Sequence, residues 1–262
     1  SSAGTIVNSK AVVYGSSGEV NATTLQIGGT SVTSTAAELN IMDGVTSSAA
    51  ELNLLDGVTG LASSVNGLSD GLIEDYSMYI GNDPSSTTST AQYNVAVGTT
   101  ALDAVTTGDG SVAIGYDALT ANTTGGYNVA IGNDAMGDNT TGGYSTAVGW
   151  RVLGKQTTGG NNTGLGSTAL RNTTTGTSNT AIGTVTLMNN ITGGYNTALG
   201  EGALNASTTA DRNTATGFRS LYIATGGGNT ALGSNSGDNL TTGTNNTLLG
   251  YVSDASSVSG TN

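Results

Sequence analysis

The sequence predicts an all-β protein, a parallel β-solenoid or β-roll that follows a small N-terminal β-module and two short helices. Ten copies of a five-residue motif such as NTAIG recur at a near-constant spacing of 17 residues. Such short, similar units are typical of a solenoid, because a helical pair or a propeller blade needs about 33 to 45 residues. Glycine supplies 42 of the 262 residues and aromatic residues only 5%, which fits a narrow body with many turns.

Residues 1–34 read as the small β-module. The stretches SKAVVYGSSGEV and TTLQIGGTSVT each place β-branched or apolar residues beside Gly/Ser turns, the pattern of short strands joined by tight connections.

Residues 35–60 hold two copies of a 13-residue unit, TAAELNIMDGVTS and SAAELNLLDGVTG. Thr35 precedes Glu38 by three residues, and Ser48 precedes Glu51 by three, which is the spacing of a helix capping box. A glycine follows each apolar pair as a stop signal. We therefore expect one short helix, of about two turns, in each copy.

Residues 61–90 are expected to form a polar connector that carries the single proline, Pro84. Within it, Tyr76, Tyr79 and Ile80 are expected to cap the first coil. The solenoid itself is expected over residues 91–250, and residues 251–262 lose the periodicity and read as an irregular tail.

The repeats align on the last glycine of each motif. These glycines are 17 residues apart eight times and 16 once, and they are Gly98, Gly115, Gly132, Gly149, Gly166, Gly183, Gly200, Gly217, Gly233 and Gly250. Each supplies a corner of the coil, where positive φ favours glycine. An apolar residue, such as Leu119 or Leu170, follows four residues after most of them. Two strands of about five residues per coil use the available length.

Stacking places identical residues of successive coils above one another. At about 4.8 Å per coil, ten coils would make a rod of roughly 45 to 50 Å. Asn128 belongs to a column that is asparagine in eight copies and serine in two. Stacked amides can hydrogen-bond along such a column, so we interpret these asparagines as structural.

Strand alternation predicts self-association. In NVAIG, Val129 and Ile131 face one way while Asn128 and Ala130 face the other. Both faces carry an apolar column, and a narrow coil can enclose only one. We expect Ile131 in the core and a stripe of alanines outside, covered by another chain. The expected partner is the same chain, most simply as a homotrimer.

The repeats, of the form NTAIGxxALxxNTTGxY, resemble those of the head region of trimeric autotransporter adhesins and of β-solenoid phage and virus fibre proteins. The matching copies span residues 94–250. The resemblance implies a trimeric, left-handed parallel β-roll, although adhesin-head units are typically shorter than these. The paired AAELNxLDGVT units resemble segments of fibre proteins from marine and cyanobacterial phages.

Side chains for catalysis are scarce. The chain has no histidine or cysteine, and Lys10 and Lys155 are its only lysines, whereas nucleophilic and acid/base catalysis depend on such groups. Asp117 and Asp134 share one column and could bind a cation or act as a glycosidase pair. The column continues with Arg151, however, so we read them as solvated turn residues. We expect no catalytic residue, no cofactor and no metal.

Charge and hydropathy restrict the partners. The net charge is −12, which opposes the basic patch that nucleic-acid binding needs. No apolar run approaches the roughly 18 residues of a membrane span, so neither nucleic acid nor membrane insertion is expected. Stacked pairs such as Thr123 and Thr124 suggest an ice-binding array, but adjacent residues of a strand face opposite ways.

These observations predict a structural fibre protein rather than an enzyme. The expected role is the shaft of a phage tail fibre, a virion surface appendage whose exposed turns meet a cell-surface glycan or protein receptor. The alternative is a bacterial or cyanobacterial surface adhesin or extracellular filament subunit, in which the same stacked coils would form the rod.

Overall fold

The computed structural model describes residues 26–27, 30–31, 71–74, 76–81 and 90–254. The chain divides into two compact units, residues 1–59 and 60–262, and each is described by itself. In the first unit, β1 (Gln26–Ile27) pairs antiparallel with β2 (Thr30–Ser31). This hairpin lies in the expected β-module, whereas the helix-capping residues Thr35, Glu38, Ser48 and Glu51 lie outside the described residues.

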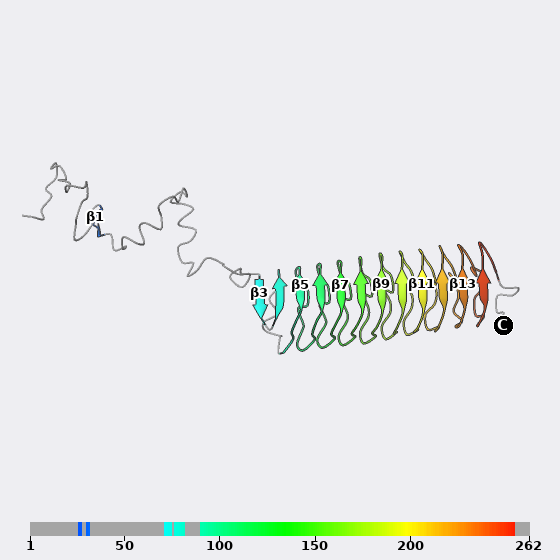
Figure 1. The fold of residues 1–262 in the computed structure, drawn as a ribbon, viewed down its shortest axis with the longest axis horizontal. Helices are drawn as coiled ribbons and strands as arrows, with labels where there is room; N and C mark the ends of the chain where they lie inside the picture. Colours follow the sequence, from blue (N-terminus) through cyan, green and yellow to red (C-terminus); the bar gives the residue numbers. More distant parts are fainter. Residues whose placement is uncertain (1–25, 28–29, 32–70, 75, 82–89, 255–262) are drawn as a thin grey trace, which may run out of the picture. The chain divides into compact units, whose positions relative to one another are not determined.

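The second unit is a parallel β-solenoid of about ten coils (Figure 1). Its described part contains no helix. One sheet of 12 strands runs along it, with its strands stacked in sequence order. They are β3 (Gly71–Glu74), β4 (Ser77–Ile80), β5 (Val95–Val97), β6 (Val112–Ile114), β7 (Val129–Ile131), β8 (Thr146–Val148), β9 (Thr163–Leu165), β10 (Thr180–Ile182), β11 (Thr197–Leu199), β12 (Thr214–Thr216), β13 (Thr230–Leu232) and β14 (Thr247–Leu249).

The sheet begins before the ten aligned motifs. Strand β4 is parallel to β5, with Met78 opposite Val95 and Tyr79 opposite Ala96. The stretch SMYIG, residues 77–81, is therefore one more copy of the motif, 17 residues before the first. Tyr79 is fully buried in the alanine position. Strand β3 pairs antiparallel with β4 and covers that edge of the parallel array, which would otherwise expose unpaired backbone groups.

Each coil contains one three-residue strand, so the expectation of two five-residue strands per coil is wrong. The rest of each coil is turn-like, yet it is hydrogen-bonded to its neighbours: the Leu119 N–H donates to the Ala135 carbonyl at 3.0 Å, and the Thr123 N–H to the Thr140 carbonyl at 2.9 Å. Left-handed residues break the second strand. Asp117 and Leu119 have φ of 55° and 53°, outside the β region.

The leucine column repeats this left-handed conformation in a buried position. Its members, φ 49° to 55°, are Leu102, Leu119, Met136, Leu153, Leu170, Leu187, Leu204 and Leu221, and all are fully buried. A left-handed residue costs about 1–2 kcal/mol, while burying a Leu or Met side chain contributes about 1.5–3 kcal/mol. Burial of the side chain therefore offsets the cost of the left-handed conformation. The next position in the column is Gly237, which keeps the positive φ, 71°, without a side chain.

The motif glycines form the corners. Gly132 has φ 134°, and a Cβ there would lie 2.4 Å from the Gly149 carbonyl oxygen of the next coil. A side chain is thus excluded both by backbone conformation and by the close stacking of coils. The nine other motif glycines also have positive φ, between 113° and 141°.

The two faces of the strand are reversed relative to the sequence prediction. Alanine, not isoleucine, points inward: Ala130 is fully buried, whereas Ile131 is 37% exposed. The interior is too narrow for branched side chains at both walls. Val152 occupies an alanine position on the far wall, and Gly164 faces it. A Cβ on Gly164 would lie 2.4 Å from Val152 Cγ1.

The asparagine column hydrogen-bonds successive coils to one another, as the motif suggested. The Oδ1 atom of Asn128 accepts the Ser145 N–H at 3.0 Å, and its Nδ2 donates to the Gly142 carbonyl at 2.8 Å. Serine fits the same position because its Oγ accepts equally: the Asn128 N–H donates to Ser111 Oγ at 3.2 Å. The column is buried, so these side chains satisfy backbone groups that water does not reach.

A second amide ladder lies in the opposite wall. Asn139 Nδ2 donates to Asn122 Oδ1 at 2.8 Å, and Gln156 Nε2 donates to Asn139 Oδ1 at 3.2 Å. All three side chains are fully buried. The column varies more in sequence, with Thr173, Asn190 and Ser207 following, so it does not stand out as a repeat feature.

Candidate functional site

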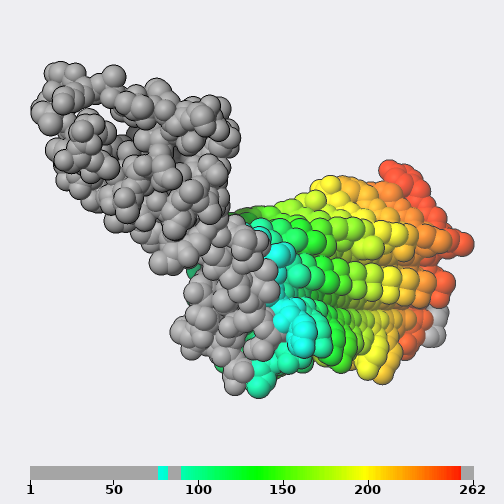
Figure 2. Space-filling view, turned by 60° about the vertical axis from the view of Figure 1, so that its left-hand side comes forward, coloured from blue at the N-terminus to red at the C-terminus, as the bar shows by residue number. Residues whose placement is uncertain are grey.

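The outward side of the parallel sheet carries a row that is aliphatic in nine of ten coils, interrupted by Thr216, and we call this row the aliphatic column. It is Val97, Ile114, Ile131, Val148, Leu165, Ile182, Leu199, Thr216, Leu232 and Leu249. Registered parallel pairing places each member beside the next, as in Ile114 opposite Ile131. Leu165 is 45% exposed and Leu232 50%. Figure 2 shows the side chains of successive coils aligned in rows along the solenoid.

The second residue of each five-residue motif lies on the same outward side. This second residue of the motif is the first residue of the strand; it is Val in β5 to β7 and Thr in β8 to β14, and its side chain is half-buried or exposed. Exposed aromatic residues border this side just beyond the motif glycine, at Tyr116, Trp150, Phe218 and Tyr251. The outward side therefore carries the aliphatic column, a parallel column of Val and Thr, and aromatic residues at four positions of its border.

A row of charged and polar residues lies one residue further along each coil from that border. Arg151 Nε lies 2.8 Å from Asp134 Oδ2, and the Arg151 guanidinium also lies over the Trp150 ring. Asp117 accepts a hydrogen bond from the Thr100 hydroxyl. The negative charge of Asp117 and a hydrogen bond with it raise the pKa of Tyr116 above its usual range.

The two column-sharing carboxylates thus each have a partner of their own. Asp134 is paired with Arg151 and Asp117 with Thr100, rather than both facing one cation or one scissile bond. Across residues 90–254 and the shorter described stretches, no three carboxylate, histidine or cysteine side chains gather as metal ligands would. The described residues also include no helix able to span a membrane.

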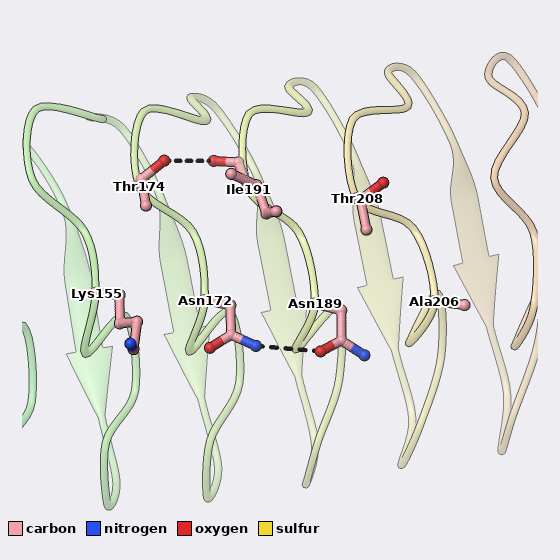
Figure 3. Close-up of a pocket in the computed structure, with 7 residues that line it drawn as sticks. All are labelled: Lys155, Asn172, Thr174, Asn189, Ile191, Ala206 and Thr208. Atoms are coloured by element: carbon pink, nitrogen blue, oxygen red, sulfur yellow. Dashed lines mark hydrogen bonds between the residues drawn. The ribbon is translucent and has the colours of Figure 1, made fainter.

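A shallow groove lies along the wall opposite the sheet (Figure 3). One edge of it is the row Lys155, Asn172, Asn189 and Ala206, and the other is Thr174, Ile191 and Thr208. Its polar groups bind one another: Asn172 Nδ2 donates to Asn189 Oδ1 at 3.1 Å, and the Thr174 hydroxyl donates to the Ile191 carbonyl at 3.2 Å. These bonds tie neighbouring coils together and leave the groove few groups for a ligand.

Tyrosines form short stacks just before the strands. The rings of Tyr127 and Tyr144 lie 5.2 Å apart at an interplanar angle of 15°, and those of Tyr76 and Tyr93 lie 5.4 Å apart at 18°. The four rings are exposed. Further along the same column, Arg212 lies over the Tyr195 ring at 5.6 Å.

No protein-family model, curated protein or solved structure matches the chain in our comparisons. The function must therefore be argued from the geometry. A repetitive β-solenoid of this kind is typical of structural proteins.

The sequence-predicted residues separate into two groups in the structure. Asn128, Leu119 and Leu170 lie inside the coil, with the motif glycines at its corners, and they build the scaffold. Ile131 lies on the outside, which makes it a surface residue rather than a core residue. The alignment contained both signals, because Ala and Ile alternate in it, but it did not indicate which of them points inward.

Proposed function

We propose that this chain is a segment of a self-associating structural fibre, the shaft of a phage tail fibre or of a comparable virion appendage. The observation that carries the proposal is the aliphatic column, half-exposed along the whole parallel sheet. Soluble monomers rarely expose a contiguous apolar strip of this extent, and such strips usually mark an interface.

The proposed partner is the same chain, in a homotrimer. Each chain offers one straight apolar side whose residues repeat at every coil. Three copies in parallel can bring this side to a common axis, so that equal columns meet at equal heights and the assembly closes. The resulting rod would be stiff, because every coil is hydrogen-bonded to the next around its perimeter.

Sedimentation equilibrium of the full chain at micromolar concentration tests the proposal. The expected mass is three times that of one chain. Replacing Ile131 and Leu165 together with Asp should give a folded monomer, because charges would be buried without partners at the interface. The matched control replaces Thr175 and Thr192, exposed turn residues on another side of the coil, with Asp, which adds the same two negative charges. A wild-type chain that sediments as a folded monomer contradicts the proposal.

The alternative owner of such a rod is a cell, as a surface adhesin or an extracellular filament subunit. The same interface would serve both. The sequence around this segment in its full gene product separates them: a particle-attachment domain or a self-cleaving chaperone favours a virion, and a membrane anchor favours a cell surface.

A second candidate function, ice binding, gains one observation from the structure. Seven consecutive outward threonines, in β8 to β14, lie two residues before the aliphatic column, which is the spacing that places side chains on one side of a sheet. Against it, Trp150 and Phe218 stand exposed at the border, and the aliphatic members differ in size. Thermal hysteresis by the monomeric variant would support ice binding, and none is expected.

A further inference from the structure

A second groove, on another side of the coil from the aliphatic column, runs across five coils between a row of threonines and the stacked tyrosines. Its threonine wall is Thr107, Thr124, Thr141 and Thr158, all exposed. Its floor is Asp109, Gly126, Gly143, Gly160 and Thr177, one residue from each coil. Four coil-to-coil steps make the floor roughly 19 Å long.

The backbone carbonyls of the floor are already used. The Tyr127 N–H donates to the Asp109 carbonyl at 2.7 Å, the Tyr144 N–H to the Gly126 carbonyl at 3.0 Å, and so on up the groove. The five floor N–H groups, by contrast, have no acceptor within the described part of the chain. The floor is therefore a row of hydrogen-bond donors without paired acceptors.

The chain itself shows what these donors bind. The residue before the floor in the same column is Gln92, and its N–H donates to Asp109 Oδ1 at 2.8 Å. The residue after the floor is Gly194, and its N–H donates to Asp211 Oδ1 at 2.7 Å. Where the next coil supplies an aspartate, its carboxylate occupies the position in front of the N–H.

Within the groove no carboxylate fills this position, because the next coil supplies glycine after four of the five floor residues and Thr177 after Gly160. A Cβ built on Gly126 would lie 3.1 Å from the Asp109 carbonyl oxygen and 3.5 Å from the Asp109 nitrogen, so a side chain there would begin beside both backbone groups and could reach the N–H as Asp211 reaches that of Gly194. Gly126, Gly143 and Gly160 have none, and each leaves the donor below it uncovered. Concave sites lined by backbone N–H groups bind anions in other proteins, and a hydrogen bond from N–H to carboxylate is among the stronger kinds.

We propose that this groove binds a linear acidic polysaccharide, with one carboxylate oxygen in front of each of several floor N–H groups. The threonine hydroxyls and the exposed tyrosine hydroxyls line the groove where the sugar hydroxyls would lie. This inference rests on the proposed fibre function, because it names the class of receptor that such a rod would meet.

Charge permits this ligand despite the net charge of −12. Residues 107–177, which span the groove, contain four acidic residues and three basic ones, Asp109, Asp117, Asp134, Asp138, Arg151, Lys155 and Arg171, so the coils that form the groove carry a net charge of only −1, and the Asp109 carboxylate already accepts the Gln92 N–H. The dipoles of the floor then decide the local attraction. A peptide fits less well, because an added strand needs alternating donors and acceptors and the floor carbonyls are occupied.

Isothermal titration of the full chain with oligogalacturonate tests the proposal, and the carboxyl-reduced neutral oligomer is the control ligand. The groove variant replaces Gly126 and Thr177 with Asp, which supplies internal carboxylates to the Asp109 and Gly160 N–H groups as Asp211 does for Gly194. We expect at least about tenfold weaker binding in the variant. A charge-matched control, T184D with N133D, should bind as the wild type does.

Asp109→Gly should have the opposite effect, since it frees the Gln92 N–H and lengthens the row by one donor. Thermal unfolding of each variant confirms that it folds. The proposal is overturned if oligogalacturonate does not bind, if the neutral oligomer or polyglutamate binds as well or better, or if the groove variant binds unchanged. Sedimentation separates the two proposals: a trimer without binding removes only this one, and a binding monomer removes only the fibre assembly.

Discussion

Replacing Asn162 with alanine should destabilise the solenoid more than the same change at Asn128, although the two residues share one column. Asn162 Oδ1 accepts the Asn179 N–H at 2.9 Å. Its Nδ2 donates to the Gly176 carbonyl at 2.8 Å and to Gln156 Oε1 at 3.0 Å. Alanine leaves all three buried groups without their partner.

The cost follows from the number of orphaned groups. Each buried polar group left unsatisfied costs about 1–3 kcal/mol, so Asn162→Ala, which orphans three, should lower the free energy of unfolding by about 3–9 kcal/mol. Asn128→Ala orphans only the Ser145 N–H, because the Gly142 carbonyl keeps the Asn139 Nδ2 donor at 3.0 Å. The expected loss there is about 1–3 kcal/mol.

Asn128→Ser is the matched control. Its hydroxyl can accept the Ser145 N–H as Ser111 Oγ accepts the Asn128 N–H, so we expect a loss of under about 1 kcal/mol. Thermal and urea unfolding, followed by circular dichroism at one protein concentration because assembly adds stability, gives the ranking. Equal losses at the two positions, or a serine variant as unstable as the alanine variant, would refute the role assigned to the ladder.

Three further changes test the interior, the outward side and the charged border. Gly164→Ala should destabilise the protein, because the new methyl group would lie 2.4 Å from Val152 Cγ1. Val152→Ala in the same chain should largely restore the free energy of unfolding. A double-mutant cycle that finds no coupling between the two changes would contradict the packing described. Ala130→Asp should prevent folding, since the site is fully buried, whereas Ile131→Asp should keep the coil folded and weaken only self-association. Circular dichroism reports the fold of each variant and sedimentation reports its association. Loss of fold in both variants would place Ile131 in the core. Asp117→Asn should lower the pKa of Tyr116 toward its usual range, as measured by tyrosinate absorbance against Tyr116→Phe. Because the pKa is raised in the folded chain, that group's contribution to stability is present at neutral pH and is lost as pH rises through the folded value; an unchanged titration would show that Asp117 is not the cause.

Several features of the fold could be read from the sequence because they depend on one repeat and its copies. The 17-residue period predicts a solenoid, the motif glycines predict corners, and the asparagine column predicts a ladder. The copy at residues 77–81 escaped the alignment because Tyr79 replaces the alanine and Met78 the threonine or valine. Only its parallel pairing with β5 reveals it.

The second strand of each coil was a wrong prediction for a physical reason. Composition and length permit an extended wall, but backbone conformation at the leucine column is left-handed, which leucine rarely adopts. Nothing in the residue type signals it. The conformation is enforced by burial of the whole column and by hydrogen bonds between coils, such as that from the Leu153 N–H to the Ala169 carbonyl at 3.1 Å.

The candidate sites divide in the same way. The aliphatic column is visible in the sequence, but the groove floor is not, because its donors are backbone N–H groups that no residue type identifies. Glycine at 126, 143 and 160 reads as an ordinary turn residue. Its meaning depends on the aspartates at 109 and 211, which show what fills the same position in other coils.

By itself the sequence determined the period and which residues of the ten aligned copies stack on which, because equal spacing forces equal residues into columns. Only the tertiary structure decided which side of the strand faces inward. Alternation allows either choice, and the choice was made by space: the inner strand position holds a methyl group where the leucine column is filled, only glycine where Val152 faces it, and a leucine, Leu248, where Gly237 replaces the facing leucine. The larger aliphatic residues are therefore left outside, where a second chain can cover them.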